Sequence, residues 1–227
     1  MPVRKNLLRV SCAICACLIV ASAQAPAQKP TTQNLGLVGG RFKPLTYDEM
    51  TPAQKTMIDH LLAGERTGLG GPFNVLLRSP EMGDLGQQFG AVMRFHASLP
   101  ATARETVIIT TARFWGAQYE WGAHKRAALQ AGVSPEIVNA IAEGRRPAGM
   151  NPDVAAAYNF IAELLKTRQV SDATFQAAKE RFGEKGVVDI IGLSGWYTIV
   201  SMALNVDRYP LANGAQPELK PLEHPIP

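Results

Sequence analysis

Cysteine is rare in this chain and is confined to its first 17 residues. All three cysteines, Cys12, Cys15 and Cys17, lie in one mostly apolar run from Val10 to Val20. We therefore interpret the C-x-x-C spacing of Cys12 and Cys15 as a product of apolar composition, not as a redox or metal motif. The rest of the chain offers no thiol nucleophile, no disulfide and no thiolate ligand.

The N-terminal segment contains no acidic residue and is typical of a secretory signal peptide. Arg4, Lys5 and Arg9 form a basic stretch around the start of the apolar run, and the letters ASAQA that follow it fit an A-x-A cleavage pattern. The apolar run is short for a transmembrane helix. We expect cleavage that removes residues 1–23, export to the periplasm or the medium, and no membrane attachment afterwards. An uncleaved membrane anchor is the alternative.

The chain also lacks a strong charge bias once this segment is removed. The formal charge of +4 includes three signal-peptide cations, so the mature chain has 20 basic residues against 19 acidic ones. The sequence pI of about 9.0 is therefore not a sign of nucleic-acid binding, and we expect no nucleic-acid partner. With 46% hydrophobic residues, the chain is able to bury a substantial core.

Strand-like alternation is missing, whereas helix signals recur. Apolar residues return at intervals of three and four, as at Tyr158, Ile161 and Leu165. Four helix starts place a capping side chain before proline, at Thr51-Pro52, Ser79-Pro80, Ser134-Pro135 and Asn151-Pro152. We predict helices at 51–63, 80–96, 101–115, 117–131, 135–143, 152–167, 172–182 and 186–204, with a helical turn at 73–77. The predicted fold class is an all-α, single-domain helical bundle.

The two ends of the mature chain have a different composition. Residues 24–45 are rich in Gln, Pro, Thr and Gly and predict a flexible leader. Residues 207–227 contain repeated prolines, which exclude a regular core helix. This tail is expected either to wrap over a neighbouring element or to stay mobile. One helical domain is therefore predicted to span residues 46–206.

Histidine is scarce as well, and one of the four histidines stands out by its neighbours. His124 lies one helical turn after Glu120, so the two side chains share a face. A carboxylate beside an imidazole orients its tautomer and raises its basicity. His60 and His96 are interpreted as structural helix residues, and His224 lies in the tail. The Glu120–His124 pair is a candidate catalytic pair, with an ordinary surface pair as the alternative.

The letters FWGAQYEWGAHKRAALQAGV around this pair, with GGPFNVLLRSPEMG before them, resemble the carboxymuconolactone decarboxylase and alkylhydroperoxidase-D-like family. The resemblance covers roughly residues 73–206. Thiol members of the family have a glutamate about a dozen residues before a C-x-x-C-x-x-x-H motif. In this chain the glutamate is Glu105 and the histidine is His124, whereas Ala117 and Glu120 occupy the cysteine positions. The chain looks most similar to cysteine-free members with YEW…H.

The resemblance implies a helical bundle that assembles as a homo-oligomer, a trimer or a hexamer. It also implies decarboxylase-like or thiol-peroxidase activity. Ala117 and Glu120 cannot perform a dithiol relay, which leaves cofactor-free acid–base chemistry. We expect carboxy-lyase-like decarboxylation or a proton shift on a small carboxylate or lactone, with Glu105, Glu120 and His124 as catalytic residues. The final predicted helix has Leu193 and YTIVS where lactone decarboxylases have a histidine and Tyr-x-Gly-x-Pro. A non-catalytic, oligomeric small-molecule-binding protein is the alternative.

Two further expectations concern the geometry and the lining of the site. A straight helix over 101–131 would place Glu105 about 22 Å from Glu120, so we predict a bend at Gly116 that returns Glu105 to His124. No third ligand accompanies Glu120 and His124, so no metal and no cofactor are predicted. The residues predicted to contact substrate are Tyr119, Trp121, Trp115, Tyr197 and Arg113. Packing in the core or at an interface is the alternative for the two tryptophans, and a surface pair is the alternative for Arg113.

Overall fold

The computed structural model describes residues 29–211 and 214–222, and the predicted signal peptide lies outside them. Within the described residues the chain forms helices and no strand beyond an isolated Thr31–Asn34 bridge, so the all-α prediction is confirmed. The helices are α1 (Pro52–Ala63), α2 (Phe73–Leu76), α3 (Pro80–Ala91), α4 (Ala101–Phe114), α5 (Gln118–Ala131), α6 (Pro135–Ala142), α7 (Pro152–Thr167) and α8 (Asp172–Asp207), with short turns η1 (Tyr47–Glu49) and η2 (Val92–His96).

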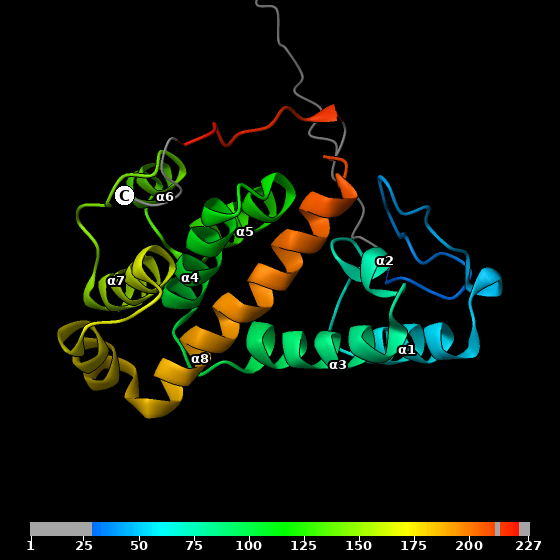
Figure 1. Ribbon diagram of the computed structural model, residues 1–227, viewed down its shortest axis with the longest axis horizontal. Coiled ribbons are helices and arrows are strands. Elements are labelled where there is room, and N and C mark those ends of the chain that lie inside the picture. The colour runs from blue at the N-terminus through cyan, green and yellow to red at the C-terminus, as the bar shows by residue number, and fades with distance from the viewer. Residues whose placement is uncertain (1–28, 212–213, 223–227) are drawn as a thin grey trace, which may run out of the picture.

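Helix α8 runs through the middle of the molecule and separates α1–α3 from α4–α7 (Figure 1). By length and composition alone α8 is apolar enough to cross a membrane, but it lies within the helical core here. Ile190, Leu193 and Val200 are buried in the core that α8 shares with α4 and α7. Gly183, with φ 68°, kinks this helix at the place where two separate helices were predicted.

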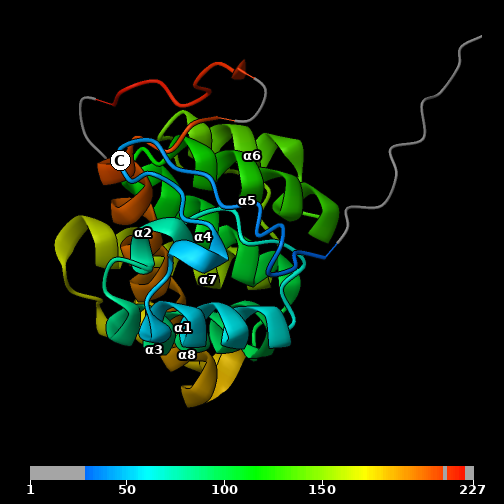
Figure 2. The same ribbon diagram turned by 90° about the vertical axis from the view of Figure 1, so that its right-hand side faces the viewer.

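Helices α1 and α3 pack on each other in the lower part of Figure 2, where the start of α8 extends below them. Helix α3 approaches α8 closely at Gly90, where an added Cβ would lie 2.3 Å from Cε2 of Trp196. Only glycine fits this contact without displacing the indole. The close approach matters for function because the turn that follows α3 contributes a side chain to the candidate site.

The predicted helix starts can be checked one by one. Thr51, Ser134 and Asn151 each accept a hydrogen bond from the backbone N–H three residues later, as the capping prediction requires. Ser79 does not cap α3 with its side chain. Its backbone has φ −137° and ψ 75°, unlike the extended conformation of the other three caps, although its carbonyl accepts the first helical hydrogen bond, from Gly83, as theirs do.

The predicted bend between α4 and α5 is present. Helix α4 ends at Phe114, α5 begins at Gln118, and Gly116 lies between them with φ +59°. That left-handed conformation is disfavoured for residues with a Cβ, which explains the glycine. The two helices pack against each other along their length, so residues near the start of α4 face the middle of α5.

Segments near both ends of the described residues are anchored to the helical bundle. The backbone N–H groups of Gly40 and Phe42 donate to the carboxylate of Asp207 at the end of α8, over 3.0 Å and 2.8 Å. Leu219 of the tail is buried and exchanges two hydrogen bonds with the Gln118 side chain. The prediction of a flexible leader is therefore wrong for residues near Gly40, because the buried Asp207 needs these donors. The tail wraps over α5, one of its two expected arrangements.

Candidate active site

A buried carboxylate–imidazole pair joins α4 and α5. Glu105 Oε2 lies 2.7 Å from Nδ1 of His124, and these residues are only 7% and 3% exposed. The bend at Gly116 makes this contact possible between residues that one straight helix would hold far apart. Because a carboxylate only accepts, Nδ1 carries the proton and Nε2 is the nitrogen available for proton exchange.

Nε2 of His124 meets two groups of opposite charge. Glu120 Oε1 and Arg94 Nη1 each lie 3.0 Å from it. In the imidazolium form, the Nε2–H group donates to Glu120. In the neutral form, the Nε2 lone pair accepts a hydrogen bond from Arg94. Nε2 therefore has a partner in each protonation state, so His124 can gain or lose the Nε2 proton without leaving this nitrogen unsatisfied.

The surroundings shift the acidity of each member of the pair. Burial favours neutral His124, but the carboxylates of Glu120 and Glu105 outweigh it and hold the pKa of His124 above its ordinary value. Burial would likewise raise the pKa of Glu105, yet the hydrogen bond with His124 and the nearby guanidinium of Arg104 hold it below its ordinary value. The pair therefore favours imidazolium with carboxylate, a form that can donate a proton.

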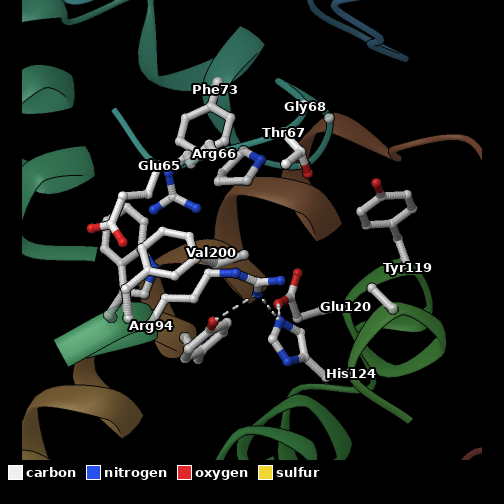
Figure 3. A pocket seen from close by; sticks show the side chains of 17 residues that line it. Glu65, Arg66, Thr67, Gly68, Phe73, Arg94, Tyr119, Glu120, His124 and Val200 are labelled. Atoms are coloured by element: carbon white, nitrogen blue, oxygen red, sulfur yellow. Dashed lines mark hydrogen bonds and ion pairs between the residues drawn. The ribbon is translucent and has the colours of Figure 1, made fainter. Parts of the chain in front are cut away.

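Arg94 comes from η2, a single π-helical turn that extends α3. Its Nη1 lies between His124 and the phenol of Tyr197, which accepts a hydrogen bond from it at 3.4 Å (Figure 3). The Tyr197 ring meets the imidazole edge to face with centroids 4.8 Å apart. π-Helical turns often occur at functional sites. Sequence reasoning missed Arg94, because the only signal is a single arginine between the apolar residues Met93 and Phe95.

These groups line a cavity of about 240 Å³. Its wall includes Arg66, Arg94, Tyr119, Glu120, His124 and Tyr197 (Figure 3). Typical drug-sized ligands occupy pockets of roughly 300–1,000 Å³, so this cavity suits a smaller molecule. Glu105 is not part of the wall, and it reaches the cavity only through His124. Burial and the nearby Glu120 raise the pKa of Tyr197, so its phenol remains a hydrogen-bond donor.

The structure brings two of the five predicted substrate-binding residues, Tyr119 and Tyr197, to this cavity. Trp121 follows Glu120 directly and therefore points about 100° away around α5, into the core beside α4 and α6. Trp115 instead donates to Thr198 Oγ1 at 3.1 Å, and Arg113 donates to the Lys220 carbonyl at 2.7 Å. The prediction that Trp115, Trp121 and Arg113 contact substrate is therefore wrong for this cavity. Trp121 packs in the core, whereas α8 and the tail bind the polar groups of Trp115 and Arg113.

The cavity is poor in metal ligands. Among the described residues, no group of three or more His, Cys, Asp or Glu side chains is arranged to hold a metal ion. At the most suitable nitrogen, Nε2 of His124, the guanidinium of Arg94 approaches to 3.0 Å and repels a second cation. The same arginine suits an anionic group of a substrate.

The fold and the site together define a class: an all-α protein with a buried glutamate–histidine pair that opens onto a small cavity. Residues 80–163 match the model of the carboxymuconolactone decarboxylase family. The match runs from α3 into α7 and includes Arg94, Glu105, Glu120 and His124. A comparison with curated proteins finds no match.

Proposed function

We propose that this protein is a cofactor-free enzyme that performs acid–base chemistry on a small carboxylate or lactone. The observation that supports this proposal is the 2.7 Å contact between Glu105 and His124, with Nε2 of the imidazole at the cavity wall. Glu105 positions the ring and fixes its tautomer. Nε2 then exchanges a proton with the substrate.

Decarboxylation is the reaction that fits these groups best. The bond between the substrate carbon and its carboxylate breaks, carbon dioxide leaves, and the electron pair remains on the substrate as an enolate. Arg94 and the Tyr197 phenol lie where they offset this negative charge. The Nε2–H group of His124 protonates the carbon, and the imidazole regains a proton from water, so one proton is consumed per turnover. A proton shift would use the same nitrogen, first as base and then as acid.

Dithiol peroxidase chemistry, the other activity of the family, is not proposed. Ala117, at the first cysteine position, is a fully buried N-cap residue of α5. Glu120, at the second, contacts Nε2 of His124. Neither side chain can attack a peroxide or form a disulfide. The described residues contain no cysteine that could replace them.

A non-catalytic small-molecule-binding protein is the competing proposal. Burying Glu105, Glu120 and His124 together is costly, because each charge must be desolvated and then compensated by the others. A purely apolar lining would bind a small molecule without that cost. Clusters of buried ionisable groups with shifted pKa values are typical of catalytic sites, which favours the enzyme.

The test is a substrate screen with a matched pair of histidine variants. The mature protein is incubated with aromatic-catabolite lactones and keto acids, and released carbon dioxide and solvent-deuterium incorporation are measured. His124→Gln should abolish turnover and keep the helical circular dichroism spectrum. His60→Gln is the control, since His60 forms a similar but exposed pair with Asp84 at 2.8 Å. Turnover that survives His124→Gln, or a screen without turnover in the wild type, would favour the binding protein.

We also propose that the protein is exported and assembles as a homo-oligomer, as predicted from the sequence. Support for assembly comes from exposed apolar side chains on neighbouring faces of two helices. Leu85 and Phe89 on α3 are 71% and 42% exposed, and Val188 and Ile191 on α8 are 64% and 50% exposed. The two faces meet where Phe89 packs edge to face on Trp196. An apolar surface of this kind fits a second copy of the chain.

A further inference from the structure

Arg66 stands out among the residues of the cavity because part of its guanidinium has no partner. Arg66 lies in the loop between α1 and α2, outside the segment that matches the family. Its Nε and Nη2 atoms are buried and make no hydrogen bond to any residue that the structure describes. These two nitrogens present their N–H groups along one edge of the guanidinium, the edge that binds both oxygens of a carboxylate.

Two aromatic rings hold this guanidinium in place. Its Cζ lies 4.8 Å from the centre of the Phe73 ring and 5.7 Å from the centre of the Phe95 ring. Cation–π contacts of this kind fix the plane of an arginine and leave its N–H edge free for another partner. In Figure 3, Arg66 and Arg94 extend into the pocket from different sides.

The carboxylates near Arg66 are engaged with other groups. Glu65 contacts His96 Nε2 at 2.6 Å, and Glu120 contacts His124 at 3.0 Å. Burial tends to lower the pKa of both arginines that line the cavity. For Arg94, the nearby Tyr197, Glu105 and Glu120 outweigh burial, and its pKa is raised. For Arg66, burial outweighs the neighbouring groups, and its pKa is lowered. Among the described residues, Arg66 is thus a cation of the cavity without a matching anion.

We propose that Arg66 is the anchor for a carboxylate of the ligand, separate from the end that reacts at His124. A buried charged donor without a partner is costly, and a carboxylate of the ligand removes that cost. The ligand is then a small organic acid that spans from Arg66 to His124 within about 240 Å³. The position of its reacting end rests on the proposed function, whereas the binding of the carboxylate does not.

The experiment compares a carboxylate with its uncharged counterpart. Benzoate and benzamide are titrated into the mature protein by calorimetry, with the wild type and three variants. The wild type should bind benzoate more tightly than benzamide. Arg66→Gln should weaken benzoate binding about ten- to a hundredfold and leave benzamide binding unchanged. Arg66→Lys should recover part of the loss, because it keeps the charge without the two-pronged edge.

Arg145→Gln is the matched control, since Arg145 is an exposed arginine that pairs with Glu143 on the surface. It should bind benzoate as the wild type does, and circular dichroism should show that all variants are folded. Equal benzoate affinity in the wild type and Arg66→Gln, or no preference of the wild type for benzoate over benzamide, would overturn the carboxylate anchor.

Binding and turnover separate this inference from the proposed function. If benzoate binding depends on Arg66 but no acid or lactone is turned over, the anchor stands and the proposed enzymatic function fails. If an organic acid is turned over equally well by Arg66→Gln, with an unchanged KM, the enzymatic function stands and the anchor fails.

Discussion

Replacing Glu105 with glutamine tests the central contact of the site. The amide keeps a hydrogen-bond acceptor for Nδ1 of His124 and removes the negative charge 2.7 Å away. Hydrogen bonds to charged groups contribute about 1.5–3 kcal/mol and neutral ones about 0.5–1.5 kcal/mol. We therefore expect Glu105→Gln to lower the free energy of unfolding by about 1–2 kcal/mol. The 3–5 kcal/mol typical of a broken buried pair is not expected, because Glu120 still compensates the imidazolium.

The size of this effect should depend on pH in a defined direction. The raised pKa of His124 gives stability that is complete below the ordinary value of 6.5 and is lost as the pH rises through the folded value. The lowered pKa of Glu105 gives stability that is present above the ordinary value of 4.5 and is lost as the pH falls through the folded value. The cost of Glu105→Gln should therefore be largest near pH 6 and smaller well above the folded pKa of His124.

Urea unfolding of the wild type and Glu105→Gln at about pH 6 and about pH 9.5 measures both quantities. Asp84→Asn is the matched control, because Asp84 pairs with the exposed His60 at 2.8 Å. An exposed pair contributes less than about 1 kcal/mol, so this control should change stability little. An equal cost of Glu105→Gln at both pH values would refute the ion pair, and a cost no larger than that of Asp84→Asn would do the same.

Three further predictions concern the bend, the apolar faces and the N-terminus. Gly116→Ala should lower the free energy of unfolding by about 1 kcal/mol, which is a few degrees in Tm, because φ is +59°. The cost should be no larger, because the added Cβ meets no neighbouring group within 4 Å. An unchanged Tm would argue against strain at the bend. Ile191→Glu should give a species of lower mass than the wild type by light scattering, because it places a charge on the exposed apolar face of α3 and α8. Phe175→Glu, before the Gly183 kink, should leave the mass unchanged. A wild-type mass in Ile191→Glu would exclude this face as the interface. N-terminal sequencing of the exported protein should begin after Ala23, and an intact N-terminus would indicate an uncleaved anchor.

The helices were predictable because their signals are local, whereas Glu105 was paired with His124 through the family resemblance. Proline after a capping residue marks helix starts, and apolar spacing marks helix faces. The bend followed from one distance, since Glu105 cannot reach His124 along a straight helix. Gly116 after two bulky residues was the natural place for it, and the structure has the turn there.

The two arginines could not be predicted because their positions depend on contacts between distant segments. Arg94 meets His124 only because Gly90 lets α3 approach α8 and a π-helical turn follows. Arg66 reaches the same cavity from a loop whose composition indicates only a turn. Trp121 was predicted to contact substrate, but it follows Glu120 directly, and neighbouring helix positions face different directions.

The leader shows why composition alone fails at the edge of a fold. Its Pro- and Gly-rich letters indicated flexibility, but flexibility also depends on whether the rest of the chain offers partners. Asp207 is buried at the end of α8 and accepts hydrogen bonds from Gly40 and Phe42. A buried carboxylate without those donors would destabilise the protein, so the end of α8 determines the path of a segment more than 160 residues earlier.

Glu120 decides whether His124 acts as an acid or as a base, and its replacement tests that role. In Glu120→Gln, Nε2 loses its anionic partner and keeps the Arg94 guanidinium at 3.0 Å. A nearby cation disfavours the imidazolium, so the pKa of His124 should fall, and the neutral ring, protonated on Nδ1, should become more populated. Nitrogen chemical shifts of ¹⁵N-labelled histidine measure the titration and the tautomer, and Glu120→Asp is the charge-retaining control. A titration midpoint that stays in place or rises would mean that Glu120 does not hold the proton on Nε2, and the proton donor for decarboxylation would then have to be another group.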